Sequence, residues 1–211
     1  MNEQEIREIV QQVLTRSGPV PMDSTIPVEA SARHVHLTAQ AVEALFGPGA
    51  TLEPVRELSQ PGEFLSDRRV RILTPKGELS GVAVLGPVRS AIQAELSLTD
   101  ARALGIQVPV NLSGDLTGAA DVYLMGTAGL LEAKGCAIAA RAHIHMTQGD
   151  ALRLGVRHGQ AVKVRVHSRR PVVFEQVPVR VSDKFALAMH IDFDEANACC
   201  LEPGCRGEII L

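Results

Sequence analysis

The 211-residue chain has no tryptophan, one tyrosine and five phenylalanines, so it offers few aromatic side chains on which nucleic-acid bases could stack. Its net charge of -3 and its lack of a basic stripe also argue against a nucleic-acid partner. No run reaches the roughly 18 apolar residues of a membrane span. The polar start Met1-Asn2-Glu3-Gln4-Glu5 is unlike a secretory signal. We therefore expect a cytoplasmic protein that neither binds nucleic acid nor enters a membrane.

Cysteine is also scarce, with four residues and no Cys-x-x-Cys pair. Cys136 lies in an apolar run, which is typical of a small buried hydrophobic side chain. Cys199, Cys200 and Cys205 lie close together in the sequence but have no histidine nearby, which makes them a poor zinc-binding pattern. We expect four reduced thiols without a catalytic role.

Histidine, in contrast, occurs in a repeated pattern. Residues 33–38 and 142–147 each contain His-x-His within an apolar run that a threonine closes. The histidines are His34 and His36 in the first copy and His143 and His145 in the second. In a strand, side chains two residues apart share a face and lie about 7 Å apart, so both imidazoles of a copy can bind one metal ion. A single His-x-His is most often two ordinary histidines, but its repetition favours metal binding.

A second repeated segment offers a third ligand to each copy. When residues 92–103 are aligned with residues 187–198, apolar positions and two alanines coincide, and Glu95 falls opposite His190. Three protein ligands leave one coordination position open, as catalytic zinc sites do. Imidazole and carboxylate ligands suit zinc and would also accept cobalt, nickel or iron. The sequence thus predicts two zinc ions per chain, bound by His34, His36 and Glu95 and by His143, His145 and His190.

Short strands and short capped helices are expected over most of the chain. Strands are predicted at residues 69–73, 79–85, 90–96, 121–125, 135–140, 161–166, 176–181 and 186–191. Helices are predicted at residues 39–46 with Thr38 as N-cap, at 100–104 with Thr99 as N-cap, and from Thr147 to Gly155 with Asp150 completing a capping box. This pattern predicts a mainly β fold with short helices, in which an internal duplication gives two similar small β-barrels.

Residues 1–18 form a separate predicted element. Ile6, Ile9, Val10, Val13 and Leu14 make the apolar stripe of an amphipathic helix, and a tether rich in proline and glycine follows. A helix of four turns on such a tether has little intrinsic stability and needs a surface for its stripe. The sequence leaves three surfaces open, namely the body of the protein, a dimer mate and a separate partner.

Longer segments around these motifs resemble a known family. They include Leu58-Ser59-Gln60-Pro61-Gly62, Leu85-Gly86-Pro87-Val88-Arg89 and Val181-Ser182-Asp183-Lys184-Phe185-Ala186. Together with the two His-x-His runs, they are similar to the PduL-type phosphate acyltransferases, also called phosphate propanoyltransferases, over residues 26–197. The resemblance implies β-barrels at residues 33–140 and 141–211, with zinc sites in the cleft between them. It also implies that residues 19–32 hold a tether and a strand that joins the second barrel.

The resemblance also implies an activity. Propanoyl-CoA or acetyl-CoA would react reversibly with phosphate to give acyl phosphate and coenzyme A. By position, Arg89 would bind phosphate, and Arg89 and Glu95 would be the catalytic residues. The sulfur of coenzyme A would complete the first zinc shell, and waters would complete the second. The family further implies a homodimer inside a bacterial microcompartment, with residues 1–18 docking on shell or core proteins.

Alternatives remain open from the sequence. The same zinc sites would suit a hydrolase, and a non-catalytic zinc-binding, shell-associated module would use the histidines for stability. Glu95 and His190 could instead be polar residues on a solvated strand face. His158 and His167 lie among arginines that favour a solvated surface but could also hold the phosphates of coenzyme A. The sequence does not select the acyl chain, the loaded metal or the oligomeric state.

Arg89 and Glu95 pose a geometric problem. If residues 90–96 form one strand, the two side chains share a face but lie about 20 Å apart. A bend after Gly86-Pro87 or a turn at Ser90 is needed to bring them together, and the sequence alone indicates neither. No serine or cysteine has a spare histidine to activate it, which favours direct attack by phosphate over a covalent acyl-enzyme.

Overall fold

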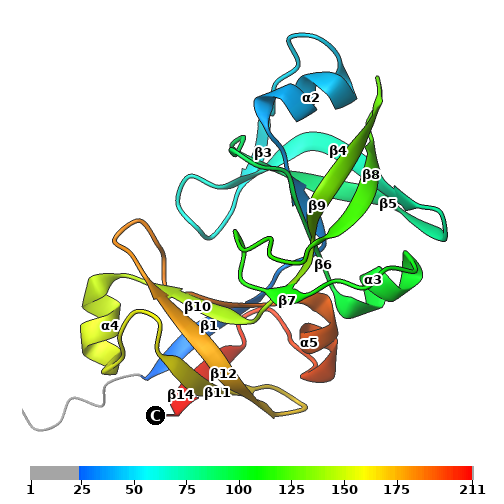
Figure 1. Ribbon diagram of the computed structural model, residues 1–211. Coiled ribbons are helices and arrows are strands. Elements are labelled where there is room, and N and C mark those ends of the chain that lie inside the picture. The colour runs from blue at the N-terminus through cyan, green and yellow to red at the C-terminus, as the bar shows by residue number, and fades with distance from the viewer. Residues whose placement is uncertain (1–23, 211) are drawn as a thin grey trace, which may run out of the picture.

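A computed structural model of the chain describes residues 24–210. The helix predicted within residues 1–18, and most of the tether, lie outside the described residues. The described chain forms two six-stranded β-barrels, one above the other in Figure 1, with short helices at their edges. This architecture confirms the mainly β fold class predicted from the sequence. Among the described residues, no helix is long and apolar enough to cross a membrane.

The first barrel follows the chain from residue 34 to residue 140. Its strands are β2 (His34–His36), β3 (Pro54–Glu57), β4 (Phe64–Thr74), β5 (Gly77–Gly86), β6 (Gln93–Leu96), β7 (Val110–Asn111), β8 (Ala120–Met125) and β9 (Leu130–Ala140). The barrel runs in the order β9, β6, β2, β5, β4 and β8, and it closes because β8 pairs with both β4 and β9. Strands β3 and β7 extend its edges.

The second barrel takes its strands from both ends of the described chain. They are β1 (Thr25–Ala30), β10 (His143–Met146), β11 (Ala161–His167), β12 (Val172–Val181), β13 (Ala188–Ile191) and β14 (Arg206–Ile210). The closed order is β1, β13, β10, β12, β11 and β14. Strand β1 pairs in parallel with β13 and antiparallel with β14, so the first strand that the structure describes completes the second barrel.

The two barrels repeat the same local arrangement. In each, the strand that carries His-x-His runs parallel to one neighbour and antiparallel to the strand that carries the proposed third ligand. His34 pairs in register with Glu95, and His143 pairs in register with His190. The register therefore confirms the alignment that placed Glu95 opposite His190. Strand β1 takes, beside β13, the parallel place that β9 takes beside β6.

Four short helices follow four of these strands. They are α2 (Ala39–Phe46), α3 (Leu98–Ala103), α4 (Gln148–Leu154) and α5 (Phe193–Ala198). Thr38 caps α2, and Thr147 with Asp150 forms the capping box of α4, as predicted. The expected N-cap of α3 at Thr99 is wrong. Ser97 caps that helix, because its hydroxyl lies three residues before Asp100 and the two side chains form a reciprocal capping box.

Two predicted strands begin later than expected. The strand predicted at residues 90–96 begins at Gln93, and the strand predicted at 186–191 begins at Ala188. Residues 87–92 instead form a bent loop after a cis Gly86-Pro87 peptide bond. In this loop the amide of Arg89 donates to the carbonyl of Leu37 at 2.8 Å, outside the sheet ladder. The bend that the Arg89 and Glu95 geometry required is therefore present.

Each barrel has its own hydrophobic core, and strand alternation decides which residues enter it. Val35 and Leu37 belong to the first core, while Ile144 and Met146 belong to the second. The histidines between them have the opposite orientation and face out of the barrels. They are nevertheless buried, with 5% of His34, 2% of His36 and 6% of His143 exposed, because the other barrel and its loops cover that face.

Candidate metal centre and active site

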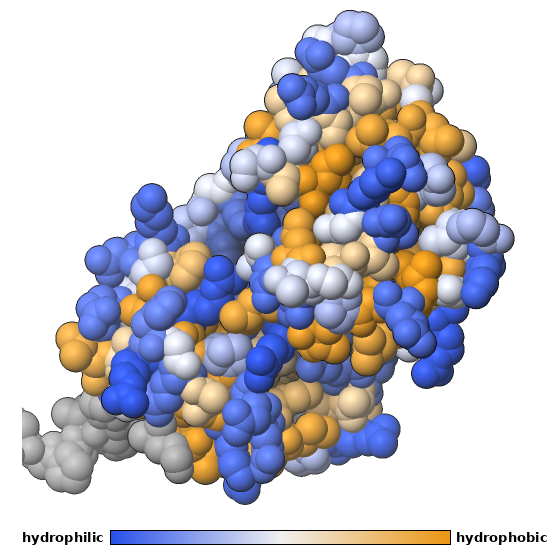
Figure 2. Space-filling model, in the orientation of Figure 1, coloured by the Kyte–Doolittle hydropathy of each residue, from blue (hydrophilic) through white to orange (hydrophobic). Residues whose placement is uncertain are grey.

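A cavity of about 940 Å³ lies where the two barrels meet. Figure 2 shows hydrophilic residues around the hollow between them. All six predicted metal ligands line this cavity, and so does Arg89. The structure therefore brings every predicted site residue to one place, although the two triplets come from different barrels. The rest of the lining includes some residues with charged side chains and others with apolar side chains.

The first triplet forms a compact group of possible ligands. The Nε2 atoms of His34 and His36 lie 3.7 Å and 4.0 Å from Oε1 of Glu95. Each residue offers one donor atom, and the three donors lie within 4.8 Å of one another. Among the described residues, no other group of three or more His, Cys, Asp or Glu side chains is this compact. Two imidazoles and one buried carboxylate at these distances fit a divalent cation such as zinc.

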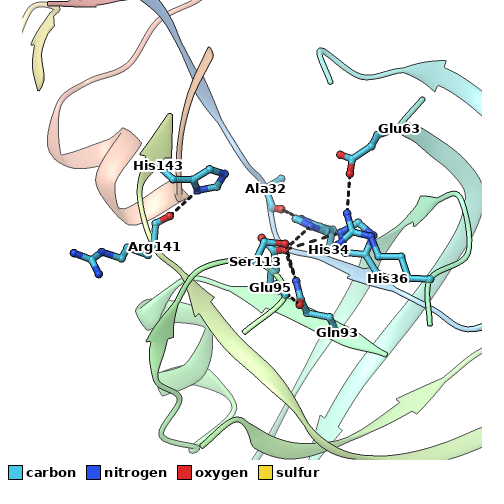
Figure 3. A network of polar contacts seen from close by, with 11 residues as sticks. Ala32, His34, His36, Glu63, Gln93, Glu95, Ser113, Arg141 and His143 are labelled. Carbon is cyan, nitrogen blue, oxygen red and sulfur yellow. Dashed lines mark hydrogen bonds and ion pairs between the residues drawn. The ribbon is translucent and has the colours of Figure 1, made fainter. Parts of the chain in front are cut away.

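Hydrogen bonds hold this triplet in place (Figure 3). Nδ1 of His34 lies 2.8 Å from the carbonyl oxygen of Ala32, which fixes Nδ1 as the donor and leaves Nε2 directed at Glu95. The amide of Gln93 donates to Oε1 of Glu95 at 2.5 Å and to the hydroxyl of Ser113 at 3.0 Å. Gln93 in turn accepts from the backbone N–H of Gly114 at 2.9 Å. The carboxylate is thus oriented before any ligand binds.

Charge interactions favour an ionised Glu95. Burial alone would raise the pKa of Glu95, but the charge and hydrogen bond of His34 outweigh it and hold the pKa far below its usual range. Burial would also lower the pKa of His34, yet the same carboxylate raises it overall. Burial, with repulsion from His34, lowers the pKa of His36 to about 3. The site without a metal therefore holds an ionised carboxylate and a neutral His36, and a cation bound there would replace the proton of His34 as the partner of Glu95.

The second triplet contains no carboxylate, and among the described residues its donor atoms do not form a group as compact as the first. Its ring centroids are 4.6 Å apart for His143 and His145, 5.1 Å for His145 and His190, and 5.5 Å for His143 and His190. Nδ1 of His143 lies 2.8 Å from the carbonyl oxygen of Arg141, which repeats the contact of His34 with Ala32. Both ring nitrogens of His145 are buried without a hydrogen-bond partner among the described residues. Such unpaired buried nitrogens fit a metal-binding role.

Burial keeps the second triplet neutral. It lowers the pKa of His143, and with repulsion from His143 it lowers the pKa of His145 to about 2 and of His190 to about 4. All three imidazoles are therefore unprotonated near pH 7. Neutral imidazole is the form that coordinates a metal, so this site also fits a divalent cation.

Arg89 reaches the cavity from the loop after β5. Its Nη2 atom donates to Oε1 of Glu63 at 2.7 Å, and this contact orients the guanidinium. Glu63 is labelled in Figure 3. The side chain is about one third exposed and lines the cavity, so the donors that do not bind Glu63 are accessible to an anion. The planar fork of arginine suits phosphate oxygens.

The sequence reasoning missed Arg180. This residue lies in β12 directly beside His145 in the register of the parallel pair, and it lines the cavity. Its guanidinium carbon lies 5.7 Å from the ring centroid of Phe185, which itself stacks on His145 at 4.2 Å. Burial lowers the pKa of Arg180. The alternation of β12, in which Val177 and Val179 enter the core, could have indicated that Arg180 faces the histidines.

Residues that were expected to lie apart from the site do so. His158 and His167 are exposed and do not line the cavity. His158 accepts a hydrogen bond from the amide of Val181, and His167 pairs with Glu208 at 3.5 Å. Cys136 is buried as predicted, and burial raises the pKa of its thiol to about 12. All four cysteines are free.

Comparison with known proteins is consistent with this geometry. The family model for phosphate propanoyltransferase matches residues 27–202. A phosphate propanoyltransferase of Leptotrichia buccalis is 49% identical over 210 residues, which cover 99% of each chain. Proteins of the same name from Alkaliphilus metalliredigens and Enterococcus faecalis are 46% and 47% identical, and the matches cover 100% and 97% of both chains. These matches confirm the family suggested by the motifs, and the chain belongs to the phosphate propanoyltransferase family.

Proposed function

We propose that this protein transfers a short acyl group between coenzyme A and phosphate, with propanoyl-CoA or acetyl-CoA as acyl donor. Its relatives carry the name phosphate propanoyltransferase, which supports the reaction class. The observation that carries the proposal is the convergence of two triplets of metal-binding residues and Arg89 on one cavity. We propose one zinc ion at each triplet.

The reaction exchanges one bond for another at the acyl carbon. A phosphate oxygen attacks the thioester carbonyl, the new carbon–oxygen bond forms, and the carbon–sulfur bond breaks to release the thiolate of coenzyme A. Zinc, when bound, would supply Lewis acidity that polarises the carbonyl and stabilises the leaving sulfur. His34, His36 and Glu95 would hold one ion, and His143, His145 and His190 would hold the other.

The protein's own residues orient the reactants. Arg89 is fixed by Glu63 and directs its remaining donors toward phosphate oxygens. Arg180 adds a second, partly buried cation to the lining from the second barrel, beside His145. These two cations, one from each barrel, lower the repulsion between the dianionic nucleophile and the negatively charged carboxylate of Glu95. Glu95 acts as a ligand and as the anionic counterpart of the cations around it.

Phosphate is the direct nucleophile in this proposal. No cysteine is among the cavity-lining residues that the structure describes. The hydroxyl of Ser113 accepts a hydrogen bond from Gln93, and the imidazoles are directed toward the proposed metals instead of toward a serine. A covalent acyl-enzyme would need a nucleophile with an adjacent base, and the other hydrogen-bonded serine of the lining, Ser59, pairs with the carboxylate of Glu29 instead of with an imidazole.

Release of coenzyme A by purified, zinc-analysed protein tests the function. We expect thiol release from propanoyl-CoA that requires phosphate and produces acyl phosphate, which hydroxylamine traps as the hydroxamate. Acetyl-CoA in a parallel assay determines the acyl preference. Thiol release without phosphate would instead identify a zinc-dependent hydrolase. Absence of release from folded protein with two zinc ions would identify a non-catalytic zinc-binding module.

We also propose that residues 1–18 direct the enzyme into a bacterial microcompartment and that the working form is a homodimer. The apolar stripe of residues 6–14 supports the first part. A fusion of residues 1–18 to a fluorescent protein should form foci in cells that produce a shell, and diffuse fluorescence would contradict it. Light scattering of the purified enzyme should give twice the 22.6 kDa of one chain.

A further inference from the structure

A buried glutamine of the first barrel reaches into the metal site of the second. Gln60 lies in the turn between β3 and β4, which two backbone hydrogen bonds close. The N–H of Leu58 donates to the carbonyl of Glu63 at 2.9 Å, and the N–H of Glu63 donates to the carbonyl of Gln60 at 3.1 Å. Only 6% of its surface is exposed. A polar side chain so deeply buried requires partners, and those of Gln60 lie in the second barrel.

The partners of Gln60 fix which way its amide points. Its Oε1 accepts from the backbone N–H of Ala186 at 3.2 Å, and its Nε2 donates to the carbonyl of Ala186 at 3.0 Å. These two backbone contacts determine which terminal atom is oxygen and which is nitrogen. The second hydrogen of Nε2 is then directed at Nε2 of His190, 3.3 Å away.

This contact determines the tautomer of His190. Because Gln60 offers a donor, Nε2 of His190 must carry the lone pair and Nδ1 must carry the hydrogen. On the other side of the ring, Nδ1 faces Oε2 of Glu29 at 4.0 Å, and Ser59 holds that carboxylate at 2.5 Å. His34 and His143 have the same tautomer, set by backbone carbonyls. No backbone carbonyl in the described part of the chain bonds to His190, and side chains of β1 and the first barrel take that role.

Gln60 also acts on a second ligand through the loop that it anchors. Ala186 follows Phe185, whose ring stacks on His145 at 4.2 Å. His145 has no hydrogen bond of its own among the described residues, so this stacking and the neighbouring histidines determine its orientation. One glutamine thus influences two of the three ligands in the second triplet.

We propose that Gln60 is a positioning residue that couples the two barrels by fixing His190, and through Phe185 also His145, for metal binding at the second site. The inference rests on the proposed function, because it assumes a metal at that site. Gln93 is its counterpart in the first site, where it is 4% exposed and holds Glu95. The difference is that Gln93 acts within its own barrel.

Two effects of Gln60 on metal affinity oppose each other. Its N–H competes with a metal for the lone pair of His190, but this is a single contact between neutral groups at 3.3 Å. Removing the side chain breaks both hydrogen bonds to the half-buried Ala186 and frees the loop that carries Phe185. The anchoring effect is larger, so loss of Gln60 should weaken metal binding.

Zinc release to a coloured chelator tests the proposal on the full-length protein. His34→Ala and His143→Ala assign the two release phases to the two sites. Gln60→Met keeps the side-chain length but removes its polar atoms, and Gln93→Met is the matched control. We expect Gln60→Met to accelerate release from the second site by about 10–100-fold and leave the first unchanged, and Gln93→Met to do the reverse. An unchanged second phase, or equal acceleration of both, would overturn the proposal.

The same experiment separates failure of this inference from failure of the proposed function. If His143→Ala binds as much zinc as the wild type, the second metal site itself is wrong, and the role of Gln60 falls with it. If His143→Ala loses one zinc but Gln60→Met behaves as the wild type, only the role of Gln60 is wrong. A measurement on wild-type protein does not depend on how any variant folds. Nitrogen NMR of the metal-free protein should show His190 protonated at Nδ1, and protonation at Nε2 would overturn the proposal.

Discussion

The two triplets occupy equivalent strands of duplicated barrels, yet they differ in charge and in support. The first contains a carboxylate, brings its donors within 4.8 Å of one another and is held by Gln93 from its own barrel. The second contains three neutral imidazoles with ring centroids 4.6–5.5 Å apart and is held by Gln60 from the other barrel. The matching strand registers thus place the two triplets in equivalent positions, while the residue types at those positions give each triplet its own charge.

The largest expected loss of activity comes from replacing the third proposed ligand of either triplet with alanine. Glu95→Ala removes the anionic ligand of the compact site, and His190→Ala removes a neutral ligand of the less compact one. We expect each to lower phosphate-dependent release of coenzyme A by at least about 10²–10³-fold, because each removes preorganised electrostatic support. Metal analysis should show one zinc lost in each variant. Equal zinc content in Glu95→Ala and wild type would show that Glu95 is not a ligand.

The next largest effect is expected from substitution of Arg89, which tests whether phosphate binds beside the first triplet. Arg89→Ala should raise the KM for phosphate by about 10–100-fold, the size of one or two hydrogen bonds to a charged group, and change the KM for propanoyl-CoA less. Arg89→Lys should restore only part of the loss, because it lacks the planar fork. Arg165→Ala, an exposed arginine outside the cavity, is the control and should behave as the wild type.

The charge difference between the sites predicts a pH dependence of the metal-free protein. Unfolded histidines take up protons below about pH 6.5, whereas the pKa of folded His190 is about 4. Protonation therefore favours the unfolded state as pH falls, and His190 alone should lower the free energy of unfolding by about 2 kcal/mol between pH 6.5 and 5. The pKa of His34 is raised in the folded state instead. Its protonation therefore adds to the free energy of unfolding as pH falls through that raised pKa toward 6.5, and this contribution stays constant at lower pH.

Denaturant unfolding in the presence of a chelator measures this effect. His190→Leu should show a shallower loss of stability between pH 6.5 and 5 than the wild type. His34→Leu should keep the wild-type slope over the same interval. Equal slopes in wild type and His190→Leu would show that the His190 ring is not buried in its neutral form.

The smallest expected effect comes from the helix caps, which are alike in the two halves. Ser97→Ala and Thr147→Ala each remove one hydroxyl of a capping box and should lower the free energy of unfolding by about 1 kcal/mol. Thr99→Ala should change it by less than about 0.5 kcal/mol, because Thr99 is not the cap. A larger effect of Thr99→Ala than of Ser97→Ala would contradict the capping assignment.

Much of the candidate site could be predicted because it depends on local periodicity and on duplication. The two-residue alternation of a strand puts His34 and His36 on one face, and the aligned repeats place Glu95 and His190 in matching registers. The N-cap of α3 could also have been found, since Ser97 and Asp100 have the spacing of a capping box.

The rest of the site depends on contacts that leave no local pattern. Gln60 meets Ala186 and His190 across 126 and 130 residues, and the way the barrels pack decides that contact. The late start of β6 has a similar cause, because the amide of Arg89 bonds to the carbonyl of Leu37 and takes residues 87–92 out of the ladder. Side-chain types alone do not indicate such pairings.

The place of β1 in the second barrel has a consequence for synthesis on the ribosome. Strands β2 to β9 are all available once residue 140 has emerged, so the first barrel can fold while translation continues. Strand β1 leaves the ribosome first, but its partners β13 and β14 are made last. At about 5–20 residues per second, β1 waits on the order of ten seconds or more without its partners. The order of synthesis therefore makes the second barrel, and the histidine triplet that it carries, the last part of the enzyme to form.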